Sequence, residues 1–136
     1  MSALALQHGA INLGQGFPDT DGPDAVLDAA VAAIRGGRNQ YPPGPGTAEL
    51  LAAIAAHQHR FYGIELDPSR EVLVTVGATE AIAATILALV QPGDEVVTFE
   101  PYYDSYAASI ALAGGVRRTS VLRFPDFALD EASLRA

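Results

Sequence analysis

Three small residues, Gly77, Ala78 and Thr79, have the types and the position needed to bind an anion. They follow a β-branched run over residues 71–76 and begin a segment with apolar residues at helical spacing. At the start of a helix, free backbone N–H groups and the helix dipole favour a phosphate. Gly77 lets the main chain approach a ligand, and the Thr79 hydroxyl can add a hydrogen bond. The alternative is a compact turn in which Thr79 merely caps the helix.

Two other phosphate-binding patterns fit less well. Glu100 ends the next expected strand, where a dinucleotide site would place a carboxylate that binds the ribose. Gly77 is not followed by a second and a third glycine at the spacing of that motif. A P-loop is excluded because it requires a lysine, and all eight basic residues of this sequence are arginines.

Three tyrosines, Tyr102, Tyr103 and Tyr106, come directly after the strand expected over residues 95–100. Parallel strands end at the same edge of a sheet, so these rings are expected near the Gly77 turn. A tyrosine there could stack on a planar ligand whose phosphate binds at the turn. The alternative is that the rings pack helix against sheet. Both alternatives stay open for Tyr103, whereas packing is favoured for Tyr102 and Tyr106.

The composition excludes several other kinds of chemistry. Without lysine, this polypeptide has no amine side chain for covalent catalysis. Without cysteine, it has no disulfide, no thiolate metal site and no thiol nucleophile. His8 lies in an N-terminal segment expected to be mobile, and His57 and His59 point to different faces of one helix, so no metal site is expected.

The bulk properties are those of an ordinary globular domain. The chain has 136 residues, enough for one domain with a single core, and 49% of them are hydrophobic. The net charge of −8 argues against a nucleic acid or an anionic membrane as the main partner. The first residues lack the features of a secretory signal, and no apolar run is long enough to span a bilayer. We therefore expect a cytoplasmic protein.

Helices and strands are expected to alternate along the chain. Pro23 suits the first position of a helix that the pair Gly36-Gly37 ends, and Thr47 suits the cap of a second helix. The prolines and glycines of residues 39–46 exclude regular structure between these helices. Further on, strands are expected over residues 71–76, 95–100 and about 116–122, with helices after the first two and a short helix after residue 130.

This order predicts an α/β fold of three layers with a mostly parallel sheet. Each strand–helix–strand unit makes two parallel strands and covers them with the connecting helix. Three strands are few for a sheet buried on both faces, so the chain is expected to be one part of a larger fold.

Four motifs in order resemble the fold-type I aminotransferases that use pyridoxal 5'-phosphate (PLP). They are "NLGQGFPD", "NQYPPGPGTAELLAAIA", "VTVGATEAI" and "PGDEVVTFEPYYDSY", which begin at Asn12 and end at Tyr106. The resemblance as a whole covers nearly the entire chain, from about Asn12 to the end. More narrowly, the sequence is similar to the class I/II branch that contains kynurenine–oxoglutarate, methionine and N-succinyldiaminopimelate aminotransferases.

The resemblance implies roles for particular residues. The main-chain amides at Gly77, Ala78 and Thr79 would hold the PLP phosphate, and the ring of Tyr103 would stack on the pyridine ring. Tyr41 matches a tyrosine that reaches the phosphate site of the neighbouring subunit, which implies a homodimer with shared active sites. Gly16 matches a glycine near the substrate carboxylate. Residues 1–40 would form an N-terminal arm and a segment of the small domain, and residues 41–136 the first part of the large, PLP-binding domain.

The resemblance also shows what this chain lacks. Family members bind PLP covalently through a lysine, and they use an aspartate at the pyridine nitrogen and an arginine at the substrate carboxylate. All of these lie downstream of the matched region, so the chain covers roughly the first third of the pattern. It therefore contains no catalytic residue of its own and is expected to be inactive alone. The complete enzyme would transfer an amino group from an amino acid to a 2-oxo acid. The alternative is a non-catalytic phosphate- or nucleotide-binding α/β module, or a truncated partner subunit.

Overall fold

The structure of this protein is a computed structural model that describes residues 1–14, 16 and 18–135. The chain divides into two compact units, Met1–Pro42 and Pro43–Ala136. The assignment of residues 1–40 to a small domain and of residues 41–136 to a large one stays a prediction. None of the described helices is long and apolar enough to cross a membrane.

The first unit contains two helices, α1 (Ser2–His8) and α2 (Asp24–Arg35). Helix α1 was not expected from the sequence. It ends at Gly9, whose left-handed backbone, with φ of 59°, directs its N–H group back to the last turn. Helix α2 begins one residue later than predicted. Pro23 is its N-cap, not its first helical residue, because the ψ of Pro23 is an extended 134°.

The second unit begins with helix α3 (Ala48–Tyr62), which is capped as the sequence predicted. The Thr47 hydroxyl accepts a hydrogen bond from the Leu50 N–H group, and Gly63 ends the helix with a φ of 66°. The apolar stripe of this helix brings Leu51 into the interior, where it is buried.

The strand predicted over residues 71–76 does not form. Residues 72–75 have no ladder, and the Val74 N–H group donates instead to the carbonyl oxygen of Pro45 at 2.9 Å. The neighbouring Gly46 has a φ of +119°, and a Cβ atom there would lie 2.8 Å from Val74 Cγ2. β-branched residues favour an extended backbone, but a strand also needs a neighbour to complete its hydrogen bonds. The described residues provide no such neighbour.

The rest of the second unit alternates helices and strands, as expected. Helix α4 (Gly77–Leu89) leads to strand β1 (Glu95–Glu100), and helix α5 (Asp104–Leu112) leads to strand β2 (Val116–Val121). The strands are parallel, with Glu95 opposite Val116 and Glu100 opposite Val121. This confirms the α/β class and the parallel sheet, although the described sheet has two strands where three were predicted. Helix α6 (Glu131–Arg135) starts after Asp130, as predicted.

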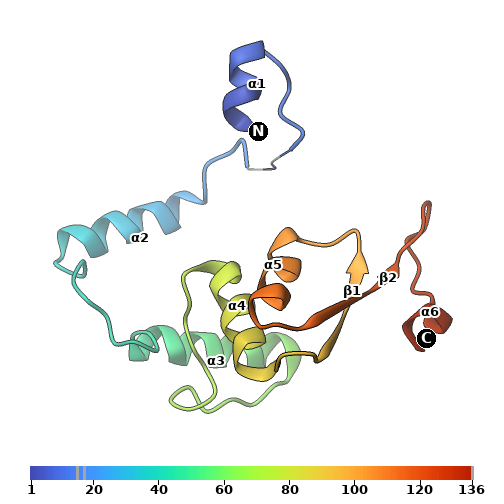
Figure 1. Cartoon of the computed structure of the whole chain (residues 1–136). Helices are drawn as coiled ribbons and strands as arrows, with labels where there is room; N and C mark the ends of the chain where they lie inside the picture. Colours follow the sequence, from blue (N-terminus) through green and yellow to red (C-terminus); the bar gives the residue numbers. More distant parts are fainter. Residues whose placement is uncertain (15, 17, 136) are drawn as a thin grey trace. The chain divides into compact units, whose positions relative to one another are not determined.

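Helices α4 and α5 pack against one another beside the two strands, as Figure 1 shows. The interior is small, because Leu51 and Ile110 are the buried apolar side chains among the described residues. On β2, Arg118 bonds to the Glu95 carboxylate of β1, and this hydrogen bond raises the pKa of the Arg118 guanidinium. Helix α5 therefore packs on both α4 and β2, and much apolar surface stays exposed.

Candidate functional site

The candidate site begins at the first turn of α4. Gly77 has a φ of +78°, which glycine adopts more readily than other residues, and its N–H group bonds to the Thr75 carbonyl at 2.9 Å. The Thr75 hydroxyl donates to the Gly77 carbonyl oxygen at 3.0 Å, and the Glu80 carboxylate accepts from the Val76 N–H group. These bonds set the direction of the chain as it enters the helix.

The structure corrects the role of Thr79. It was expected to be the cap of the helix, but Val76 occupies the N-cap position and Thr79 lies inside the first turn. The left-handed Gly77 starts the helix three residues earlier than a cap at Thr79 would. The amides of Ala78 and Thr79 therefore lie in the first turn, where no preceding turn offers a carbonyl partner. This is the arrangement that an anion needs at a helix N-terminus.

Tyr103 and Thr79 meet, although 24 residues separate them in the sequence. The Tyr103 hydroxyl lies 3.1 Å from Thr79 Oγ1, within hydrogen-bond distance. Tyr103 is the N-cap residue of α5, so this bond joins the starts of two successive helices. The structure thus brings together Gly77, Ala78, Thr79 and Tyr103, four of the predicted site residues.

The other two tyrosines have protein partners of their own. Tyr106 meets the Tyr103 ring edge to face, with centroids 5.9 Å apart and an angle of 87° between the planes. The guanidinium carbon of Arg117 lies over the ring of Tyr102, 4.7 Å from the ring centroid. The ring of Tyr103 is 51% exposed and so presents a free surface next to the α4 turn.

Glu100, the residue considered for a ribose contact, forms an ion pair instead. Its carboxylate lies 3.1 Å from Arg117 Nη1, which also donates to the Thr119 hydroxyl at 2.8 Å. This pair links β1 to β2 and holds the guanidinium over Tyr102. No ribose contact is indicated for this carboxylate.

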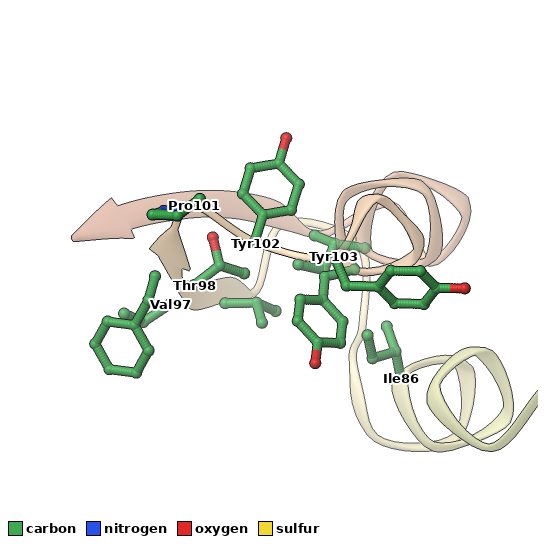
Figure 2. A pocket seen from close by; sticks show the side chains of 10 residues that line it. Ile86, Val97, Thr98, Pro101, Tyr102 and Tyr103 are labelled. Atoms are coloured by element: carbon green, nitrogen blue, oxygen red, sulfur yellow. The ribbon is translucent and has the colours of Figure 1, made fainter. Parts of the chain in front are cut away.

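A cavity of about 600 Å³ lies between α4, α5 and β1. Figure 2 shows Val97 and Thr98 of β1, the following Pro101, Tyr102 and Tyr103, and Ile86 of α4 around it. Its walls are largely apolar, and the buried Thr98 hydroxyl has no hydrogen-bond partner. The volume is within the range of small-molecule sites, roughly 300 to 1,000 Å³. The cavity is a feature that sequence reasoning missed, because it depends on how the helices cover the strand.

Tyr41 and Gly16 belong to the first unit, and both are exposed. The side chain of Tyr41 is fully accessible, and a Cβ atom on Gly16 would have no atom within 4 Å. The predicted roles of Tyr41 at a neighbouring subunit and of Gly16 near a substrate carboxylate stay predictions. Among the residues that the structure describes, no group of three or more His, Asp or Glu side chains is placed to hold a metal ion.

Comparison with known proteins decides the family. The sequence profile of the family "Aminotransferase class I and II" matches residues 8–135, nearly the whole chain. The chain belongs to this family. The resemblance seen in the four sequence motifs is thereby confirmed.

Individual members of the aminotransferase family are similar over almost all of this chain. A probable N-succinyldiaminopimelate aminotransferase of Mycobacterium tuberculosis is 60% identical over 99% of the chain, and the methionine aminotransferase of Escherichia coli is 50% identical over 96%. The solved structure of N-succinyldiaminopimelate aminotransferase from M. tuberculosis superposes with a TM-score of 0.92 and covers 99% of the chain at 61% identity. The chain spans about a third of the length of these relatives, 34% of each sequence and 36% of the solved chain.

Class I and II aminotransferases depend on PLP, and the site described above fits this cofactor. The first-turn amides of Ala78 and Thr79 suit a phosphate group. The half-exposed ring of Tyr103, joined to Thr79, suits the planar pyridine ring beside that phosphate. The family and the geometry therefore favour PLP over a dinucleotide as the ligand of the turn.

Proposed function

We propose that this chain forms the PLP phosphate-binding part of an aminotransferase that transfers an amino group from an amino acid to a 2-oxo acid. The observation that carries the proposal is the contact between Thr79 and Tyr103. It places a helix N-terminus and an aromatic ring side by side, in a chain whose family uses PLP. When bound, PLP supplies the electron sink of the reaction.

The residues of this chain bind and orient the cofactor. The amides of Ala78 and Thr79 would donate hydrogen bonds to the phosphate, and the positive end of the α4 dipole would add to the attraction. The Tyr103 ring would stack on the pyridine ring and help to orient it. Proton transfer is assigned to a lysine outside these 136 residues, because the chain contains none.

The complete protein is proposed to be a homodimer with shared active sites. Tyr41 follows the segment "NQ" and precedes two prolines, which stiffen the chain around it. Its fully exposed side chain is free to reach the phosphate of a neighbouring subunit. Gly16 is proposed to lie near the substrate carboxylate, where the lack of a side chain leaves room for the substrate.

Substitution of Gly77 tests the phosphate site. In the complete protein that contains this chain, Gly77→Ala should raise the PLP dissociation constant about tenfold, because an alanine at positive φ is strained by about 1–2 kcal/mol. Relief of that strain turns the amides of Ala78 and Thr79 away from the phosphate. The measurement is PLP titration of the apoprotein, followed by the absorbance of the bound cofactor.

Gly63→Ala is a matched control for this experiment. Gly63 also has a positive φ, 66°, and open space around its Cα, but it ends α3 and is not part of the site. This variant should lose similar stability and keep the wild-type affinity for PLP. A wild-type protein that binds no PLP, or that fails to transfer an amino group to a 2-oxo acid, would overturn the proposed function.

A further inference from the structure

We infer that the hydroxyl groups of Tyr103 and Thr79 form a directed hydrogen-bond relay to the phosphate, in which Tyr103 donates to Thr79 and Thr79 donates to the phosphate. The inference rests on the proposed function and assigns a positioning role to two side-chain hydroxyls. Binding of the phosphate would then fix the ring of Tyr103, so the two halves of the cofactor site would act together.

The geometry supplies the first step of the relay. The two hydroxyl oxygens are 3.1 Å apart, and either of them can be the donor. Tyr103 is half exposed, and its ring is supported from the side by Tyr106. The bond to Thr79 therefore restrains the far end of a ring whose exposed surface is free to meet a ligand.

The direction of the bond follows from the donors that each hydroxyl has. A hydroxyl carries one hydrogen and two acceptor lone pairs. If Thr79 donated to Tyr103, it would offer only lone pairs to an anion at the start of α4, which is repulsive. If Tyr103 donates, the Thr79 hydrogen is free to point to the anion. A bound phosphate selects the second arrangement.

The charge of the phosphate strengthens this arrangement. Hydrogen bonds to ionised acceptors are shorter and stronger than neutral ones, and a donor that also accepts a hydrogen bond is polarised further. The loss of the Tyr103 hydroxyl should therefore weaken phosphate binding, although that hydroxyl does not contact the phosphate. A tyrosine that only stacked on the pyridine ring would have no such effect.

A double-mutant cycle in the complete protein tests the relay. Thr79→Val and Tyr103→Phe should each raise the PLP dissociation constant, by about tenfold and about threefold. The increase in the dissociation constant of the double variant should be about threefold smaller than the product of the two single increases. The reason is that Tyr103→Phe has no effect once the Thr79 hydroxyl is gone. Pyridoxal, which lacks the phosphate, should show no such coupling. Thr79→Ser keeps the hydroxyl that Thr79→Val removes, so it should show the wild-type affinity for PLP and the wild-type circular dichroism of bound PLP.

A second arm uses inorganic phosphate alone. Tyr103→Phe should raise the dissociation constant of phosphate from the apoprotein about threefold, since the relay acts without the pyridine ring. Tyr102→Phe is the matched control. It removes a hydroxyl from the adjacent tyrosine, whose ring lies under Arg117, and should leave the binding of phosphate unchanged.

The outcomes separate the relay from the proposed function. A wild-type protein that binds PLP, with additive effects of the two single variants, would overturn the relay alone. The same holds if the coupling is equal for PLP and pyridoxal, or if Tyr103→Phe leaves phosphate binding unchanged. A wild-type protein that binds no PLP would overturn the proposed function and the relay with it.

Discussion

Borohydride reduction of the 136-residue chain in the presence of PLP should leave no pyridoxyl group on any side chain. Covalent attachment of this cofactor requires a side-chain amine, and every basic residue of the chain is an arginine. The guanidinium group of arginine stays protonated in proteins and does not act as the nucleophile. The expected effect is a complete loss, which mass spectrometry of proteolytic peptides measures directly.

The N-terminal amine needs its own control, since it can also react with an aldehyde. The peptide that begins at Met1 should carry any label that is found, and acetylation of that amine should remove it. The complete protein, treated in parallel, should be labelled on a lysine outside these residues. A pyridoxyl group on a side chain of residues 1–136 would contradict the expectation that this chain alone cannot perform the transfer.

Expressed alone, the chain should self-associate and should not unfold cooperatively as a monomer. The buried apolar side chains that the structure describes are Leu51 and Ile110, and each stabilises the fold by about 1.5–3 kcal/mol. Large apolar residues such as Val97 and Phe99 of β1 stay exposed, and each strand of the β1–β2 pair has one unpaired edge.

Light scattering coupled to size-exclusion chromatography measures this association, and circular dichroism during heating measures cooperativity. The complete protein is the control and should give one defined species with a single sharp transition. A monodisperse monomer of residues 1–136 that melts sharply would show that this part of the fold is stable by itself.

Local chemistry made the helices after α1 and two of the strands predictable from the sequence. Thr47 at the start of α3 accepts a hydrogen bond from a neighbouring backbone N–H group, so its cap role does not depend on distant segments. Strand β1 was predicted with its observed bounds, Glu95–Glu100. It forms because β2 completes its hydrogen bonds. Residues 71–76 have similar β-branched composition but lack a partner, so the same reasoning predicted a strand that is not there.

The candidate site was predictable in its residue types but not in its contacts. Gly77, Ala78 and Tyr103 were identified because they follow expected strands and carry groups suited to phosphate and to an aromatic ring. The cap role predicted for Thr79 was wrong, since the left-handed Gly77 moves the start of α4 to residue 77. The partner of the Thr79 hydroxyl lies on another helix, and helical spacing carries no information about it.

Residue types and their order along the chain therefore established the α/β class and the absence of a lysine for covalent attachment of PLP, and they predict a phosphate-binding turn at Gly77. These properties depend on local backbone preferences and on which side chains exist. The folded chain added the bond between Thr79 and Tyr103, the ion pair that occupies Glu100, and the missing ladder at residues 71–76. Each of these depends on which segments meet in space, and that is set by the packing of α4 against α5 and of α5 against β2.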